Sequence, residues 1–219
     1  MSLSANRKLS GSDSRPVPPK SLPGFENVRR YWDRKHEVFS ARILPGEYYV
    51  SNQNEVITTV LGSCISACIR DKNIGAGGMN HFMLPDDNSG GKGGGCTNLA
   101  TRYGTFAMEH MINDILALGG RQQDLEIKLF GGGKMLSSMA DIGERNIQFV
   151  THYLATELLP ITSEDLGGRH PRKVVYFPGS GKVLMKKMPI VQDSVIAQTE
   201  MQYQKSLVET PLTGDIDLF

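Results

Sequence analysis

The stretch TTVLGSC at residues 58–64 predicts a strand that ends in a tight corner directly before a cysteine. β-Branched and apolar residues from Val56 to Val60 favour the strand, because such side chains pack well on a pleated surface. The Gly62-Ser63 pair favours the corner, since glycine adopts turn conformations at no steric cost. Cys64 is therefore expected at the point where the chain reverses direction.

The segment that follows this corner predicts an antiparallel hairpin. A strand-like run at residues 65–70 is followed by the turn sequence DKNIG at residues 71–75 and by a returning run at residues 76–84. Two such runs separated by a short polar loop with a glycine are typical of paired strands. The returning run carries His81.

The hairpin register decides whether Cys64 meets His81. A turn centred between Lys72 and Asn73 places the two directly opposite each other, with Cβ atoms about 4.5–5.5 Å apart. A five-residue loop would shift the register by one and turn the histidine to the other face. At the first register the pair can share a proton. The alternative is a buried core cysteine beside a structural histidine.

A paired cysteine and histidine would form a nucleophilic site. A free cysteine has a pKa of about 8.5, and a neighbouring imidazolium lowers that pKa and creates the thiolate. The Gly62-Ser63 corner can present backbone N–H groups to a developing oxyanion. Thr58, on the adjacent strand, can hold the imidazole by a hydrogen bond. Cys68 is expected to be a buried structural residue.

Composition is ordinary for a globular protein and excludes several classes of function. The chain has 219 residues, 39% hydrophobic and 21% charged, with a net charge of +1. This charge gives no general case for nucleic-acid binding. Three cysteines form neither a disulfide framework nor a zinc-ligand spacing, so we expect a reduced, cytoplasmic protein without metal or cofactor. No apolar run is long enough for membrane insertion, and no signal-peptide core is seen at the N-terminus.

Three segments are predicted from charge and composition. Residues 1–42 hold nine Lys/Arg against four acids and begin with a Ser/Pro-rich stretch, which predicts a flexible basic leader with a possible helix near its end. Residues 43–190 form the folded domain, and residues 191–219 form a polar tail that is either loosely ordered or a partner-binding motif. The leader is either solvated or docks on an acidic partner.

Further elements are predicted from periodicity, and glycine-rich loops separate some of them. Strands and helices follow one another without regular βαβ alternation, which favours an α+β fold. The loop at residues 85–96 is expected to be mobile, and the run at residues 131–134 is expected to pack its backbone closely near the site. The predicted elements are strands at 48–51, 125–130, 174–177 and 183–187 and helices at 98–118 and 143–158.

Several motifs in order resemble the CheD family, the chemoreceptor glutamine deamidases of bacterial chemotaxis. The resemblance covers roughly residues 45–187. It rests on Thr58-x-x-Leu61-Gly62-Ser63-Cys64, Asp71, His81-Phe82-Met83-Leu84-Pro85, Phe130-Gly131-Gly132-Gly133-Lys134-Met135, Ile142-Gly143-Glu144-Arg145-Asn146, Asp165-Leu166-Gly167-Gly168 and Arg172-Lys173-Val174.

The resemblance implies a Cys-His-Thr triad. Cys64 would be the nucleophile, His81 the general base and acid, and Thr58 the group that orients His81, with Thr59 as the adjacent alternative. The implied fold is a layered α/β/β arrangement of mixed sheets with helices on one side, similar to the deamidating-toxin cysteine hydrolases.

The implied reaction converts protein-bound glutamine to glutamate with release of ammonia, and the same chemistry suits glutamyl methyl esters. The implied substrates are the cytoplasmic helices of methyl-accepting chemoreceptors, and a CheC-type phosphatase is a possible partner. The alternative function is a binding module that regulates such a phosphatase or a receptor with weak catalysis. A thiol protease is a third possibility, for which no cleft is indicated.

Overall fold

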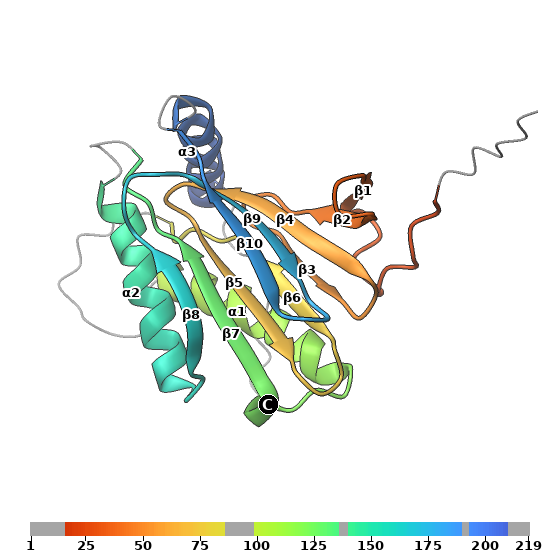
Figure 1. The fold of residues 1–219 in the computed structure, drawn as a ribbon. Coiled ribbons are helices and arrows are strands. Elements are labelled where there is room, and N and C mark those ends of the chain that lie inside the picture. Colours follow the sequence, from red (N-terminus) through yellow and green to blue (C-terminus); the bar gives the residue numbers. More distant parts are fainter. Residues whose placement is uncertain (1–15, 86–98, 136–139, 190–192, 210–219) are drawn as a thin grey trace, which may run out of the picture.

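Two five-stranded mixed sheets lie face to face in the computed structural model, which describes residues 16–85, 99–135, 140–189 and 193–209 (Figure 1). In the first sheet only the β2–β4 pair is parallel, and the remaining pairs are antiparallel. The order in this sheet is β1 (Arg29–Asp33), β2 (Val38–Arg42), β4 (Glu55–Leu61), β9 (Arg172–Phe177) and β10 (Lys182–Lys187).

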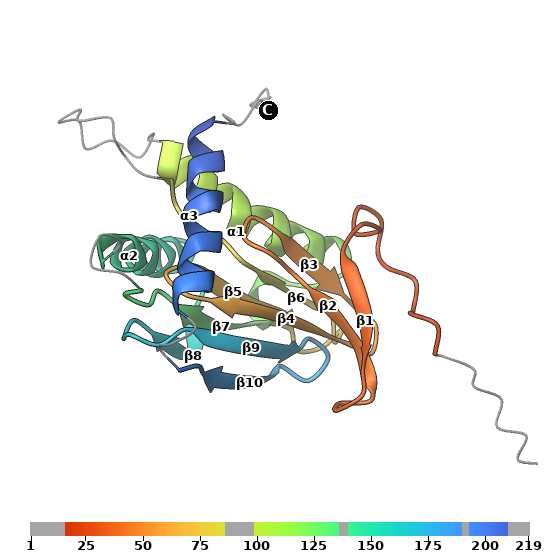
Figure 2. The same cartoon turned by 90° about the horizontal axis from the view of Figure 1, so that it is seen from above.

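The second sheet carries the helices. Helices α1 (Leu99–Ala117) and α2 (Ala140–Thr156) cover its outer face, so the molecule has one helical layer and two sheet layers (Figure 2). This arrangement confirms the predicted α+β fold with helices on one side. The strand order in this sheet is β3 (Tyr48–Ser51), β6 (Gly77–Asn80), β5 (Ile65–Asp71), β7 (Leu125–Gly131) and β8 (Ile161–Leu166), and a short 3-10 helix, Gln122–Asp124, precedes β7.

The predicted hairpin forms between β5 and β6, but its register differs from the predicted one by two residues. Cys68 pairs with Met79, and Ile65 forms a bridge with Phe82. The turn sits later because the Asp71 carboxylate accepts hydrogen bonds from backbone N–H groups inside the loop. A shift of two keeps each side chain on its face of the sheet. The Cys64 and His81 positions are therefore diagonal neighbours rather than direct opposites.

The N-terminal region contributes two strands to the first sheet. The segment predicted as part of a flexible leader with a possible helix instead forms β1 and β2, and residues 38–41 are buried. The Asp33 carboxylate accepts hydrogen bonds from the N–H groups of Lys35 and His36 and so closes the turn between the strands. The folded domain thus begins before the predicted boundary at residue 43. Residues 1–15 lie outside the described ranges.

The C-terminal segment also differs from the expected polar tail. Its described part is the helix α3 (Asp193–Glu209), which stands at one end of the sheets (Figure 1). Ala197 and Glu200 of this helix are 1% exposed. The helix therefore packs against the folded domain. The predicted mobile loop at residues 85–96 lies almost wholly outside the described residues.

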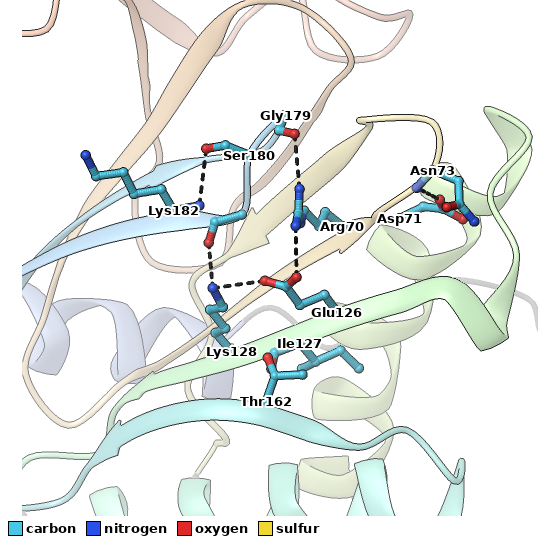
Figure 3. A network of polar contacts seen from close by, with 11 residues as sticks. Arg70, Asp71, Asn73, Glu126, Ile127, Lys128, Thr162, Gly179, Ser180 and Lys182 are labelled. Carbon is cyan, nitrogen blue, oxygen red and sulfur yellow. Dashed lines mark hydrogen bonds and ion pairs between the residues drawn. The ribbon is translucent and has the colours of Figure 1, made fainter.

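A polar network joins the two sheets at the end of β5 that is distant from Cys64 (Figure 3). Glu126 of β7 pairs with Arg70 of β5 and with Lys128, each at 2.9 Å. Arg70 and Lys128 also donate hydrogen bonds to the carbonyl oxygens of Gly179 and Gly181 in the β9–β10 turn. Because the turn belongs to the first sheet and the charged side chains belong to the second, the network fixes one sheet against the other.

Candidate active site

Cys64 lies where the chain passes from one sheet to the other. Strand β4 ends in the first sheet, the Gly62-Ser63 corner follows, and β5 begins in the second sheet. Gly132 and Gly133, which follow β7, hold this corner by backbone hydrogen bonds. The N–H of Gly132 donates to the carbonyl oxygen of Cys64 at 2.9 Å, and the N–H of Gly133 donates to that of Gly62 at 2.7 Å. These contacts confirm the predicted close backbone packing near the site.

His81 is held by a threonine of β4. The Thr59 hydroxyl oxygen lies 2.8 Å from His81 Nδ1 and 2.9 Å from the carbonyl oxygen of Ile43. A hydroxyl has one proton, and the carbonyl can only accept, so the hydroxyl donates to Ile43 and accepts from Nδ1–H. This network assigns the tautomer in which Nε2 has a free lone pair. Nε2 is buried and has no hydrogen-bond partner among the described residues.

The structure does not bring Thr58 to the imidazole ring. The Thr58 hydroxyl donates instead to the carbonyl oxygen of Val174 on the neighbouring strand β9, at 3.0 Å. Successive side chains of a strand point to opposite faces, so only one of two adjacent threonines can reach the ring. The expected contact from Thr58 is thus corrected to Thr59, which the sequence offered as the alternative.

The sulfur and the imidazole do meet. Cys64 Sγ, a ring nitrogen of His81 and a carboxylate oxygen of Glu200 all lie within 4.8 Å of one another. No hydrogen bond joins the sulfur to His81 Nε2, but catalytic hydrogen bonds are often long before substrate binds. The two residues are 0% and 2% exposed. Cys64 and His81 therefore lie close together, but as diagonal neighbours rather than as the predicted direct opposites.

Glu200 of α3 enters this site and was not predicted from the sequence. Its Oε1 accepts hydrogen bonds from the N–H groups of Gly62, at 2.8 Å, and Cys64, at 3.3 Å. Its Oε2 accepts from the N–H and the hydroxyl of Ser63, at 2.8 and 2.7 Å. Three successive backbone N–H groups thus converge on one carboxylate. The corner presents the N–H donors that the sequence predicted, and a side chain of the same protein occupies them.

Asn146 is a second buried polar residue that sequence reasoning did not assign to the site. Its Nδ2 donates to the carbonyl oxygen of Ser63, and its Oδ1 accepts from the N–H of Leu84, both at 2.9 Å. It therefore ties the cysteine corner to the strand end that carries His81. A signal was available, because Asn146 interrupts a buried stripe at four-residue spacing with Ile142 and Val150.

The electrostatics of the site differ from the predicted activated thiolate. Burial, together with the charge of Glu200 and a hydrogen bond to it, raises the pKa of the Cys64 thiol well above its usual value. Burial lowers the pKa of His81 to about 4, against an opposing effect of the Glu200 charge. At neutral pH the structure therefore holds a neutral thiol beside a neutral imidazole.

Cys64, His81 and Glu200 are of the residue types that bind zinc, so a metal must be considered. Both carboxylate oxygens of Glu200 already accept hydrogen bonds from the corner. A metal would have to compete with these donors for the carboxylate lone pairs. The donor set therefore favours a hydrogen-bonded carboxylate over a metal ligand.

Comparison with known proteins gives one consistent result. The family described as CheD chemotactic sensory transduction matches residues 83–187, directly downstream of His81. A probable chemoreceptor glutamine deamidase CheD of Halorhodospira halophila is 51% identical over 92% of this chain and 94% of its own. Similarly named proteins of Hahella chejuensis and Saccharophagus degradans are 49% and 48% identical, over 92% and 96% of this chain and 95% and 97% of their own. None of the helices in the described ranges has the length and apolar composition needed to cross a bilayer.

Proposed function

Because the chain belongs to the CheD family, we propose that it deamidates glutamine side chains of chemoreceptors to glutamates in bacterial chemotaxis. The observation that carries the proposal is the placement of Cys64 and His81 within 4.8 Å of each other at a corner rich in backbone N–H donors. The substrates are the cytoplasmic helical regions of the receptors, as the family resemblance implies, and the protein therefore works in the cytoplasm.

His81, Cys64 and the N–H donors of the corner each have one role in the first chemical step. His81 Nε2, the nitrogen left free by the Thr59 hydrogen bond, accepts the Cys64 proton. The resulting thiolate attacks the side-chain carbonyl carbon of the substrate glutamine, and the carbonyl oxygen becomes an oxyanion. The N–H groups of Gly62 and Ser63 stabilise this charge, a contribution that is usually large because such donors are already oriented.

The second half of the reaction regenerates the enzyme. The imidazolium of His81 protonates the leaving nitrogen, the C–N bond breaks, and ammonia departs. A water molecule then loses a proton to His81 and attacks the carbonyl carbon of the thioester that Cys64 has formed. The C–S bond breaks, glutamate is released, and the Cys64 thiolate regains the proton from His81. Thr59 is a positioning residue in this scheme, since it acts through the ring. A glutamyl methyl ester would pass through the same intermediate with methanol as the leaving group.

Incubation with the cytoplasmic fragment of a methyl-accepting chemoreceptor tests the function. We expect selected glutamines to become glutamates, detected by peptide mass spectrometry and by ammonia release. The alternative function, a binding module for a receptor or a CheC-type phosphatase, predicts a different result. A receptor fragment that binds equally well to the wild type and to Cys64→Ala, with every glutamine intact, would favour the binding module.

A pair of threonine variants tests the role of Thr59. Thr59→Val removes the hydroxyl that fixes the His81 tautomer, and we expect kcat to fall by about 10- to 100-fold with little change in KM. Thr58→Val removes an equally buried hydroxyl from the opposite face of the same strand, and kcat should stay within about twofold of the wild type.

The pH profile shows whether Thr59→Val acts on His81 or only destabilises the protein. Loss of the hydrogen-bond acceptor for Nδ1 should shift the pH dependence of kcat in Thr59→Val and not in Thr58→Val. Equal kcat losses in both variants would contradict the proposed role.

A further inference from the structure

The side chain that occupies the candidate active site has the structure of the proposed reaction product. Deamidation of glutamine yields glutamate, and Glu200 is a glutamate presented by a helix, as the receptor glutamines are in the proposed function. Its carboxylate lies within 4.8 Å of Cys64 Sγ and of a His81 ring nitrogen. The carboxylate oxygens stand where the carbonyl oxygen of a bound substrate would meet the same backbone donors.

The contacts of Glu200 explain how a carboxylate tolerates this position. Glu200 is 1% exposed, and its carboxylate accepts hydrogen bonds from three N–H groups and from the Ser63 hydroxyl. Hydrogen bonds to a carboxylate are stronger than those between neutral groups and offset its desolvation. We call this group of four donors, on Gly62, Ser63 and Cys64, the seat. It suits an oxygen that carries negative charge.

Other contacts position the rest of α3 over the site. The Tyr203 hydroxyl is hydrogen-bonded to that of Tyr103 on α1. The Tyr203 ring lies against Gly46, where an added Cβ would overlap it. Along the same helix, Val195 and Thr199 border a cavity of about 400 Å³ that reaches His81 and Thr59. The helix is thus packed on the domain through its buried face, with a cavity beside its N-terminal half.

Docking of α3 has two consequences for the reacting groups. It places the Glu200 carboxylate within 4.8 Å of the Cys64 sulfur, and with the helix in this position Cys64 is 0% exposed and cannot be reached by a receptor side chain. It also sets a negative charge beside the sulfur, which opposes formation of a thiolate. Both effects suppress the chemistry for as long as the helix remains in place.

We propose that α3 is an internal product mimic that inhibits the enzyme, with Glu200 occupying the seat of the substrate side chain until the helix leaves. The inference rests on the proposed function, since it identifies the occupied seat with that of the receptor glutamine. The match with the Saccharophagus degradans relative covers 96% of this chain. The part of the chain outside this match is shorter than α3, so the match includes at least part of the helix.

Glu200→Ala tests the proposal in the full-length chain, with the exposed Gln202→Ala on the same helix as the matched control. We expect Glu200→Ala to raise the rate of Cys64 alkylation by iodoacetamide, followed by peptide mass spectrometry, by about tenfold or more. The initial rate of receptor deamidation should rise as well. Gln202→Ala should match the wild type in both assays. Unchanged Cys64 alkylation in Glu200→Ala would overturn the inference.

The two readouts separate this inference from the proposed function. Alkylation reports only access to Cys64 and its ionisation, whereas deamidation reports the reaction. Faster alkylation without conversion of any receptor by either protein would support the docked helix and count against the deamidase. Equal alkylation with normal deamidation in both proteins would overturn the inhibitory helix and leave the deamidase intact.

Glu200→Gln provides a second variant that keeps the shape of the side chain. It places a substrate carboxamide in the seat, so the enzyme should deamidate itself. Cys64 attacks the amide carbon at position 200, ammonia leaves, and water hydrolyses the thioester to restore glutamate.

We expect conversion at position 200 in this variant but not in the double variant with Cys64→Ala, while the exposed Gln198 and Gln202 remain amides. A retained amide at position 200, in a protein that deamidates receptors, would overturn the proposed position of α3.

Discussion

Cys64→Ala is expected to lower the rate of receptor deamidation by about 10³-fold or more, because Cys64 supplies the sulfur of the thioester in the proposed mechanism. The oxyanion donors and the substrate site remain, but both stabilise an intermediate that alanine cannot produce. The measurement is the time course of glutamine conversion in receptor peptides, with enough enzyme to detect single turnovers.

Cys68→Ala is the matched control, since Cys68 is also buried, at 1% exposed, and belongs to the adjacent strand rather than to the site. Its loss should reduce stability modestly and leave kcat unchanged. His81→Ala should lower the rate by about 10²- to 10⁴-fold, the usual contribution of general acid–base catalysis. Conversion at the wild-type rate by folded Cys64→Ala protein would exclude the cysteine mechanism.

Local patterns were sufficient for much of the fold. The strands β3, β4, β5 and β7 and the helices α1 and α2 lie close to their predicted ranges. Strand β7 alternates and the helices have a 3.6-residue period, whereas β3, β4 and β5 are short, mostly buried runs bounded by turn residues. Strand β8 was missed, since its sequence ITSEDL is mostly polar and alternates weakly. The segment at β1 and β2 was predicted as possibly helical because it is rich in charged residues, and its strand conformation depends on the pairing of β2 with the distant strand β4.

The sequence predicted that Cys64, His81 and a threonine lie near one another, but it predicted neither their exact geometry nor the presence of Glu200 and Asn146. Which of two adjacent threonines faces the histidine depends on which side of β4 meets β6, and this is a property of the packed sheets. The hairpin register depended on the Asp71 side chain, which moved the turn by one residue while each side chain kept its face.

The contribution of α3 required information that the sequence holds only over long distances. Glu200 is separated by 138 residues from Gly62, from whose N–H it accepts a hydrogen bond. No local period links the two segments. A weak signal existed within the helix, where Ala197, Glu200 and Leu207 share a buried face. A single acid in such a stripe predicts burial against donors, but it does not identify those donors.

The glycine run approaches the cysteine corner so closely that there is no space for a side chain at Gly131. Gly131 has a φ of 117°, and an added Cβ would overlap the carbonyl oxygen of Cys64. Gly131→Ala should therefore combine backbone strain with a collision between the new Cβ and the backbone of Cys64. No side-chain rotation can relieve this collision. We expect a loss of about 2–4 kcal/mol in the free energy of unfolding, measured by urea titration.

Gly119→Ala separates the two causes. Gly119 has a similar φ of 98° with nothing within 4 Å of an added Cβ, so it carries the strain without the collision. We expect it to cost only about 1–2 kcal/mol and to leave kcat unchanged. Gly131→Ala should in addition lower kcat, because the corner that bears Cys64 must shift relative to His81, and its N–H donors lose their alignment. Equal losses of stability with unchanged kcat in both variants would mean that the corner tolerates displacement, and that the glycine run does not hold the nucleophile in position.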